Sequence, residues 1–475
     1  MTTLSQHGLG IAPSEILARQ RAAFLKEGPP SLAQRKADLR KLKSAILARR
    51  EEIQNALIAD FGHRSPHETA IMEVMTVIQA INYQRCNLRR WMRPEKRQVP
   101  MHFQPGRAWV NYQPLGVIGV MSPWNYPLSL ALMPLATALA AGNRVMIKPS
   151  EFTPTSSALL HRLAGEVFGP EQVAVVMGDA GVGQAFSALP FDHLLFTGST
   201  EVGRSVMKAA SENLVPVTLE LGGKSPVIIE PGHCIGHAAT SIAHGKLANA
   251  GQICIAPDYV LVHQDALDDF IGAFDRAVRR LYPEGPLSDQ YTSVINERHY
   301  DRLNALLDDA REKGARIVEV GERSADAGRR AHTLAPTVVV GTNERMRIMQ
   351  EEIFGPVLPV LPYRDIDQAI AYINGRPRPL ALYFFGGNGP NRRKVLELTT
   401  SGNVTINNTL MHYAQEDLPF GGVGPSGMGA YHGIEGFKAL SHARGVFQQG
   451  KWNLSGMLRP PFGGIARLIL ALMLR

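Results

Sequence analysis

Hydrophobic residues recur at helical spacing through the N-terminal part of the chain. Five of them fall three, four or seven positions apart, as on one face of a helix: Leu39, Leu42, Ile46, Ile53 and Leu57. A further helix is predicted from about residue 66 to 91, with an apolar stripe formed by Ile71, Val74, Met75, Ile78 and Ile81. The first part of the chain is therefore predicted to be helical, with one helix ending near Gly62 and another near Trp91.

Short apolar runs bounded by Gly or Pro then alternate with longer helical stretches. A first set of such runs covers residues 115–121, 144–148, 173–177, 193–197, 217–221 and 227–230. A second set covers residues 259–263, 337–340, 357–361, 380–385 and 403–407. Alternation of this kind is typical of βαβ units and of a parallel sheet covered on both faces. The fold class is therefore predicted to be α/β, with two α/β domains that meet near Gly222 and Gly223.

The composition is that of a globular protein, because 45% of the 475 residues are hydrophobic and 19% are charged. The formal net charge of +8 is compatible with an anionic partner such as a dinucleotide, a nucleic acid or a membrane surface. The densest basic run, residues 35–50, lies on a predicted helix with an apolar face, which favours a solvated helix face over a nucleic-acid patch. No zinc-finger or RNA-recognition motif accompanies it. We therefore expect no nucleic-acid partner.

Three cysteines occur in the chain, namely Cys86, Cys234 and Cys254. So few cannot form a disulfide framework, which predicts a reducing compartment, and the polar residues among 1–20 do not resemble a signal peptide. We therefore expect a cytoplasmic protein. The apolar stretch 465–474 is about half as long as a membrane-spanning helix and is interrupted by Arg467. This tail either packs on the protein or contacts a membrane surface.

Three residues are candidates for covalent chemistry. Cys254 lies between a flexible Gly and a Pro, and as a thiolate it could act as a nucleophile, although a buried Cys is often only a small hydrophobic residue. Glu220 interrupts an apolar run before a Gly pair, where burial would raise its pKa and fit it to act as a base; the alternative is a strand Glu paired to Lys224. Asn125 could donate to a developing oxyanion, or be an ordinary turn residue.

Two further segments could bind a dinucleotide. Residues 193–203 predict a strand, a Gly-containing turn and a helix over 201–210, which would present a helix N-terminus to a pyrophosphate. The usual G-x-G-x-x-G spacing is missing, so an ordinary strand-to-helix turn stays open. Lys148-Pro-Ser-Glu151 follows an apolar run and could bind ribose hydroxyls or phosphates, with surface-loop charge as the alternative.

Seven segments resemble, in the same order, motifs of the aldehyde dehydrogenase family. They are Pro123-Trp-Asn-Tyr-Pro127, Lys148-Pro-Ser-Glu151, Phe196-Thr-Gly-Ser-Thr200, Glu220-Leu-Gly-Gly-Lys-Ser-Pro226, Gly251-Gln-Ile-Cys254, Glu351-Glu-Ile-Phe-Gly-Pro356 and Pro419-Phe-Gly-Gly422. The resemblance covers nearly the whole chain, and the interval from Glu220 to Cys254, 254 minus 220 or 34 positions, is the one that this family uses. Three other segments are similar to the class 3 branch, and within it to bacterial coniferyl aldehyde dehydrogenases: residues 255–259, 407–412 and 427–432.

The resemblance implies oxidation of an aldehyde to a carboxylic acid through a thioester on Cys254, with Glu220 activating the hydrolytic water and Asn125 stabilising the oxyanion. It implies a set of cofactor-binding residues: Trp124, Lys148, Glu151, Gly198, Ser199, Glu352 and Phe354. NAD is the expected cofactor because an acid at the ribose disfavours a 2′-phosphate, while Lys148 is compatible with NADP. Tyr126 and Phe420 are expected in the substrate pocket, and no metal site is expected.

The resemblance also implies a domain organisation and a homodimer. A Rossmann-like NAD(P)-binding domain is expected over residues 1–91 and 113–221, and a catalytic domain over 222–412. Small β bridging or oligomerisation segments are expected over 92–112 and 413–450, followed by a C-terminal tail over 451–475. The dimer contact is expected around residues 89–112 and after Phe437.

Other functions remain open on the sequence. A fatty aldehyde dehydrogenase with a membrane-touching tail is one alternative to an aromatic aldehyde dehydrogenase. A coenzyme A-acylating dehydrogenase is another, although such enzymes generally lack the hydrolytic Glu that Glu220 supplies here. A basic binding protein that has kept only the fold is difficult to reconcile with every catalytic position being filled.

Overall fold

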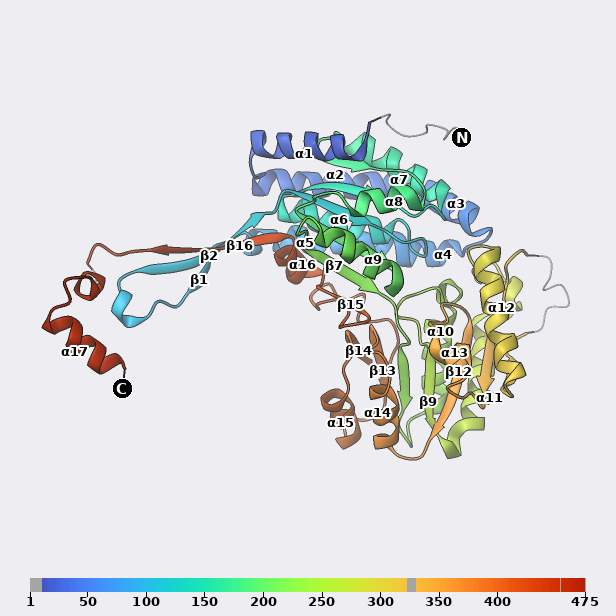
Figure 1. Ribbon diagram of the computed structural model, residues 1–475. Coiled ribbons are helices and arrows are strands. Elements are labelled where there is room, and N and C mark those ends of the chain that lie inside the picture. The colour runs from blue at the N-terminus through green and yellow to red at the C-terminus, as the bar shows by residue number, and fades with distance from the viewer. Residues whose placement is uncertain (1–10, 323–329, 453, 475) are drawn as a thin grey trace.

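The computed structural model describes residues 11–322, 330–452 and 454–474. Figure 1 shows two α/β bodies, one above the other, and a thin arm that projects from the side of the upper body. The upper body holds most of the N-terminal half of the chain, and the lower body holds residues from about β8 (Pro226–Ile229) to β14 (Asn403–Ile406). The α/β class predicted from the alternating apolar runs is confirmed.

The upper body is built on a six-stranded sheet with the order β15-β7-β6-β3-β4-β5. Its strands are β3 (Val117–Met121), β4 (Arg144–Lys148), β5 (Val173–Val175), β6 (His193–Gly198), β7 (Val217–Leu221) and β15 (Gly427–Met428). All pair in parallel except β15, which runs antiparallel to β7. The near-continuous apolar runs therefore form strands that are buried on both faces.

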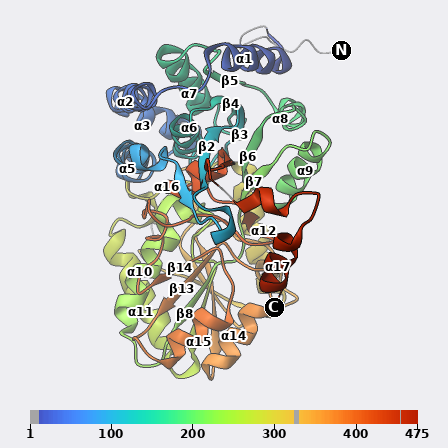
Figure 2. The same cartoon turned by 90° about the vertical axis from the view of Figure 1, so that its left-hand side faces the viewer.

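Helices cover both faces of this sheet, as Figure 2 shows with α5 and α6 on one side and α8 and α9 on the other. Their bounds are α1 (Pro13–Glu27), α2 (Leu32–Ala48), α3 (Arg50–Phe61), α4 (Pro66–Glu68), η1 (Thr69–Met75), α5 (Thr76–Trp91), α6 (Ser129–Ala141), α7 (Pro154–Val167), α8 (Ala180–Ser187) and α9 (Thr200–Ser211). Every residue of α6 is buried, because this helix lies between the sheet and the N-terminal helices.

The lower body is built on a seven-stranded sheet with the order β10-β11-β12-β9-β8-β13-β14. Its strands are β8 (Pro226–Ile229), β9 (Tyr259–His263), β10 (Arg316–Glu319), β11 (Thr337–Val340), β12 (Val357–Tyr363), β13 (Ala381–Phe385) and β14 (Asn403–Ile406). Its main helices are α10 (Ile235–Leu247), α11 (Leu267–Leu281), α12 (Glu297–Glu312), α13 (Arg347–Gln350), α14 (Ile366–Asn374) and α15 (Pro390–Leu398). Val227 packs in the same core as Phe270 of α11, whereas its neighbour Ile228 packs with Ile370 of α14. Successive strand residues thus contact helices on opposite faces.

The arm is a three-stranded antiparallel sheet of β1 (Glu95–Arg97), β2 (Arg107–Pro114) and β16 (Ser441–Gln448), which joins segments far apart in the sequence. β1 and β16 lie within the two segments expected to bridge or oligomerise, and β2 extends two residues past the expected bound at residue 112. The predicted boundary at Gly222 and Gly223 separates β7 from β8, which belong to different sheets. The domain bounds stay a prediction, since β15 returns from the C-terminal part to the first sheet.

The apolar tail forms α17 (Gly464–Met473), which lies at the far end of the arm (Figure 1). Ile465, Leu468 and Leu472 are exposed on it. Over the residues that the structure describes, no helix combines the length and the apolar character that crossing a membrane requires.

Two expectations about the N-terminal helices are wrong in detail. In the predicted apolar stripe, Ile71 and Met75 are exposed, and the charged residue Glu73 is buried instead. The reason is that residues 69–75 form a π-helix, whose wider turn shifts the inward-facing position from the expected phase. The basic run 35–50 is not solvated throughout either, because Arg35 is buried and donates to the carbonyl oxygens of Ala140 and Ala141 at the end of α6. The five apolar positions from Leu39 to Leu57 are all buried as predicted.

Candidate active site

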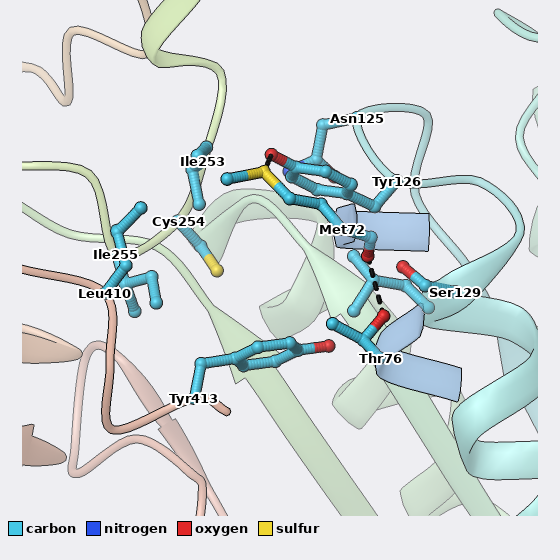
Figure 3. Close-up of a pocket in the computed structure, with 11 residues that line it drawn as sticks. Met72, Thr76, Asn125, Tyr126, Ser129, Ile253, Cys254, Ile255, Leu410 and Tyr413 are labelled. Carbon is cyan, nitrogen blue, oxygen red and sulfur yellow. Dashed lines mark hydrogen bonds between the residues drawn. The ribbon is translucent and has the colours of Figure 1, made fainter. Parts of the chain in front are cut away.

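A cavity lies beside Cys254, where the loop of the lower body faces the helices of the upper body. It encloses about 500 Å³ outside the protein atoms, counting its open mouth. The lining residues are Met72, Thr76, Asn125, Tyr126, Ser129, Leu130, Ile253, Cys254, Ile255, Leu410 and Tyr413. Figure 3 shows the thiol of Cys254 pointing into this space, with Thr76 and Ser129 on the opposite side. The wall is mostly apolar, which suits a hydrophobic substrate.

A turn with unusual backbone angles holds Cys254 at the cavity. After α10 the chain passes through Asn249, Ala250 and Gly251, all with positive φ angles. A Cβ on Gly251 would lie 2.4 Å from the carbonyl oxygen of Gly355, so a glycine is required there. The side chain of Gln252 fixes the turn, since its Nε2 donates to the carbonyl oxygen of Asn249 at 2.9 Å and its Oε1 accepts from another backbone N–H. Such strain is characteristic of functional sites.

Asn125 is held against the same loop by its side chain and its backbone. Its Nδ2 donates to the carbonyl oxygen of Gln252 at 2.9 Å, which leaves its second amide hydrogen for another acceptor. Its own carbonyl oxygen accepts from Arg64 at 2.8 Å and from Asn249 Nδ2 at 3.1 Å. Hydrogen bonds therefore hold Asn125 against the loop that carries Cys254 on the cavity wall.

A buried ion pair supports this unit from behind. The guanidinium of Arg64 lies 4.7 Å from the ring centroids of both Phe61 and Tyr126, and one of its nitrogens lies 3.6 Å from Glu73. The other oxygen of Glu73 accepts from the backbone N–H of Ser129 at 2.6 Å. Burial raises the pKa of Glu73, and the Arg64 charge opposes that rise. The pair thus ties the π-helix to the loop that carries Asn125.

The Cys254 thiol lies in surroundings that keep it protonated. Burial is the main cause that raises its pKa, followed by the charges of Glu352 and Glu220, while the backbone N–H groups of Cys254 and Ile255 act in the opposite direction. A thiolate at this position therefore needs added positive charge or added hydrogen-bond donors.

Glu220 is an unpaired acid near the end of β7. It is 2% exposed, and neither carboxyl oxygen has a hydrogen-bond partner among the residues that the structure describes. Burial raises its pKa well above the ordinary range. The pairing with Lys224 left open by the sequence does not occur, because the ammonium of Lys224 pairs with Asp258 and donates to two backbone carbonyls. A buried carboxyl without a partner fits a group that exchanges protons during a reaction.

This burial predicts how Glu220 affects stability at different pH values. The pKa of Glu220 is raised in the folded protein above the unfolded value of 4.5. Its contribution to the free energy of unfolding is therefore complete below pH 4.5. That contribution is lost as the pH rises toward the folded pKa, by at most about 1.4 kcal/mol per pH unit. An amide stays neutral at every pH. We therefore expect the melting temperature of Glu220→Gln, relative to that of the unmodified protein, to be higher at pH 8 than at pH 5.

The measurement is thermal unfolding at both pH values, with the exposed acid Glu397 changed to Gln as the matched control. Glu397→Gln is expected to show no pH-dependent difference of this size. The same melting-temperature difference for Glu220→Gln at pH 5 and pH 8 would mean that the carboxyl is not held neutral by burial.

The residues expected to bind the cofactor lie at the carboxyl ends of parallel strands in the first sheet. Lys148 is the last residue of β4, Gly198 is the last residue of β6, and Trp124 follows β3 closely. In the sheet, β3 pairs with β4 on one side and with β6 on the other. The chain continues from β3 to β4 and β5 and then crosses to β6, so the strand order reverses between β3 and β6, and this is the switch point of the sheet. Dinucleotides bind at such switch points.

The chemistry at this edge fits a dinucleotide. Ser199 caps the N-terminus of α9 by accepting from the N–H of Val202 at 3.4 Å, and a helix N-terminus attracts phosphate. The Lys148 ammonium contacts the carbonyl oxygen of Pro149 at 2.8 Å and the half-exposed Glu151 at 3.4 Å. Burial lowers the pKa of Lys148, and Glu151 opposes this shift. A cation and an acid thus stand together where a ribose and its phosphates would lie.

Three more of the residues expected to bind the cofactor lie between this edge and the second body, namely Trp124, Glu352 and Phe354. The ring of Trp124 contacts Phe354 edge-on with centroids 5.4 Å apart, and Phe354 has a positive φ of 50°. Burial raises the pKa of Glu352 to about 8, with Asp258 adding to the rise. A Cβ on Gly222 would lie 2.1 Å from the Glu352 carboxyl, so the glycine lets that carboxyl approach the backbone after β7.

The two residues expected in the substrate pocket differ in their positions. Tyr126 lines the cavity, and its hydroxyl donates to the sulfur of Met72 at 3.1 Å. Phe420 is buried behind Tyr413, with ring centroids 4.9 Å apart, and is not among the lining residues. In residues 11–322, 330–452 and 454–474 no cluster of three or more His, Cys, Asp or Glu could hold a metal ion.

Several site residues were not found from the sequence, namely Arg64, Met72, Glu73, Thr76, Ser129, Asn249, Gln252 and Tyr413. One signal was available for Glu73, because a charged residue inside an apolar stripe is unusual. The others follow only once the helices of the upper body are placed against the Cys254 loop.

Comparison with known proteins gives the same picture over nearly the whole chain. Residues 15–446 match the model of the aldehyde dehydrogenase family. A probable coniferyl aldehyde dehydrogenase of Caulobacter vibrioides is 48% identical over 464 residues, which cover 96% of this chain and 96% of the relative. The coniferyl aldehyde dehydrogenase of a Pseudomonas species is 44% identical over 483 residues, covering 100% of this chain and 99% of the relative.

Solved structures agree with this similarity. The substrate-bound state of Staphylococcus aureus AldH superimposes with a TM-score of 0.92 at 38% identity, covering 98% of this chain and 100% of that chain. PnpE in complex with nicotinamide adenine dinucleotide superimposes with a TM-score of 0.83 at 28% identity, covering 92% of this chain and 90% of that chain.

Proposed function

The chain belongs to the aldehyde dehydrogenase family, and from this premise we propose that it oxidises aromatic aldehydes of the coniferyl aldehyde type through a thioester on Cys254. Family membership makes the protein an NAD(P)-dependent oxidoreductase that acts on aldehydes. The proposed site rests on one observation. The Cys254 thiol and the second amide hydrogen of Asn125 lie on one cavity wall. The sheet beside that wall holds the buried carboxyl of Glu220, which has no hydrogen-bond partner among the described residues.

The nucleophile of the proposed reaction is the Cys254 thiolate, which adds to the aldehyde carbon. A carbon–sulfur bond forms, and the carbonyl electron pair becomes an oxyanion. The free hydrogen of Asn125 Nδ2 and the backbone N–H of Cys254 stabilise that oxyanion, because both are already held in place by the loop. A donor that is fixed before the substrate arrives loses little conformational freedom when it binds the oxyanion.

Glu220 acts after the oxidation, when an acyl group is attached to Cys254. A bound oxidised nicotinamide, held by Trp124, Glu352 and Phe354, would supply positive charge and an acceptor for the hydride of the former aldehyde carbon. Glu220 takes a proton from water, whose oxygen bonds to the acyl carbon while the carbon–sulfur bond breaks. The carboxylic acid leaves, the sulfur departs as the Cys254 thiolate, and Glu220 releases the proton it took to solvent.

The cofactor is held, in this proposal, by residues at the switch-point edge. Gly198 and Ser199 contact the pyrophosphate at the N-terminus of α9, and Lys148 and Glu151 contact the adenosine ribose. Glu352, Phe354 and Trp124 lie at the nicotinamide end. We propose a preference for NAD, because Glu151 would repel the 2′-phosphate of NADP; Lys148 reduces that repulsion and allows some use of NADP.

The aromatic substrate class is supported by two relatives whose names specify coniferyl aldehyde. A second candidate class is a long apolar aliphatic aldehyde, which the exposed apolar face of α17 and the apolar cavity wall favour. A coenzyme A-acylating reaction is disfavoured by Glu220, since a hydrolytic base would compete with the transfer. We also propose a cytoplasmic homodimer whose contact includes the β1, β2 and β16 arm.

The test is a steady-state assay of the purified protein with coniferyl aldehyde, benzaldehyde and a long aliphatic aldehyde. Each is assayed with NAD and NADP, with and without coenzyme A. We expect coniferyl aldehyde and NAD to give the highest kcat/KM, with free acid as the product and no effect of coenzyme A. Higher kcat/KM for the aliphatic aldehyde would support the second class, and acyl-coenzyme A as the product would contradict the hydrolytic role of Glu220.

A further inference from the structure

We propose that the cavity wall opposite Cys254 recognises a hydrogen-bond donor at the far end of the substrate, through the oxygen atoms of Thr76 and Ser129. The corresponding substrates are aromatic aldehydes with a free 4-hydroxyl group. This inference rests on the proposed function, because it assumes that the aldehyde carbon reacts at Cys254.

Thr76 offers an acceptor because its only hydroxyl proton is already used. It lies at the start of α5, and its Oγ1 donates to the carbonyl oxygen of Met72 at 2.7 Å. The lone pairs of that oxygen remain for a partner in the cavity, which Thr76 lines. Figure 3 shows this bond and the position of the Thr76 hydroxyl across the cavity from the thiol.

Ser129 places a second hydroxyl oxygen on the same side of the cavity as Thr76 (Figure 3). Its backbone N–H donates to Glu73 at 2.6 Å, which fixes Ser129 at the first turn of α6. Arg64, 3.6 Å from Glu73, supplies the opposite charge. The Ser129 hydroxyl lines the cavity and can accept a hydrogen bond from a ligand there.

The space between the two ends suits a flat ring. Apolar side chains from four segments enclose it, including Met72, Leu130, Ile253 and Leu410, together with the ring of Tyr126. A substrate whose carbonyl lies at Cys254 must therefore place its distal end toward Thr76 and Ser129 (Figure 3). A phenolic O–H reaching them finds acceptors, whereas a 4-methoxy group brings only another acceptor and added bulk.

Two tyrosines also line the cavity. The hydroxyl of Tyr126 donates to the sulfur of Met72 at 3.1 Å. Tyr413 is the second. Its Oη lies 3.2 Å from the sulfur of Met133 and 3.4 Å from the hydroxyl oxygen of Tyr431. Either tyrosine can be the donor in that contact, so Tyr413 does not distinguish donors from acceptors in a ligand. Selectivity for a donor is therefore assigned first to Thr76, with Ser129 as a second acceptor on the same side of the cavity.

The experiment compares 4-hydroxycinnamaldehyde, cinnamaldehyde and 4-methoxycinnamaldehyde with the unmodified enzyme and with the variants Thr76→Val and Ser129→Ala. We expect kcat/KM for the 4-hydroxy compound to exceed that for cinnamaldehyde by about tenfold, and that for the 4-methoxy compound by more. Each variant is expected to reduce the first ratio by several-fold, mainly through KM. Thr240→Val is the matched control, because its hydroxyl makes the same kind of bond to the carbonyl oxygen four residues earlier but lies outside the cavity.

A binding measurement keeps this inference separate from the proposed function. Calorimetric titration of Cys254→Ala protein with 4-hydroxycinnamic acid and with cinnamic acid is expected to show tighter binding of the hydroxylated acid, and Thr76→Val in that background should reduce the difference by several-fold. Equal binding of both acids, or kcat/KM ratios unchanged in both variants, would overturn the inference. Absence of turnover with all three aldehydes would contradict the proposed function, and the titration would still decide the preference of the wall.

Discussion

Cys254→Ala is expected to lower kcat/KM for aldehyde oxidation by at least about 10⁴-fold, as removal of a nucleophile does in other covalent enzymes. No other cysteine can replace it, because Cys86 and Cys234 are exposed and neither lines the cavity. Cofactor binding should survive, since the residues at the switch-point edge do not depend on the thiol. The measurements are NADH formation at 340 nm and titration of NADH binding by fluorescence.

Cys86→Ala and Cys234→Ala are the matched controls, and both are expected to keep nearly full activity. Loss of cofactor binding together with activity in Cys254→Ala would indicate damage to the fold. Substantial residual oxidation, with cofactor binding intact, would show that the nucleophile is another group.

Glu220→Gln is expected to separate the two halves of the reaction. Because Gln cannot take a proton from water, hydrolysis of the acyl group should become rate-limiting, and kcat should fall about 10²–10⁴-fold. Oxidation of the first aldehyde molecule does not need this base, so rapid mixing should show a burst of about one NADH per active site followed by slow turnover. The exposed change Glu397→Gln is the control and should show ordinary steady-state kinetics. Normal turnover by Glu220→Gln would assign the base role elsewhere.

Much of the fold follows from local patterns in the sequence. The predicted runs 144–148, 217–221, 259–263 and 337–340 coincide with strands, because strands buried on both faces are continuous apolar segments bounded by turn residues. The candidate site also follows in part from strand order. Lys148 and Gly198 are distant in the sequence, yet both stand at carboxyl ends of parallel strands in one sheet, where a doubly wound fold brings its functional loops together.

The remainder depends on geometry that no local pattern specifies. The π-helix over residues 69–75 changes which side chains face inward, so a stripe counted at ordinary helical spacing exposes Ile71 and misses Glu73. Whether Glu220 pairs with Lys224 is decided by Asp258, which competes for the lysine from the start of another strand. The cavity wall opposite Cys254 comes from helices more than a hundred positions earlier in the chain, and only tertiary packing places Thr76 there.

The most direct test of a covalent mechanism is peptide mass spectrometry of Glu220→Gln protein, acid-quenched after mixing with NAD and coniferyl aldehyde. A thioester-forming enzyme should carry one acyl group, and fragmentation should place it on Cys254 in most molecules that have produced NADH. NADH formation without an acyl group on Cys254, or with the group on Cys86 or Cys234, would contradict the mechanism.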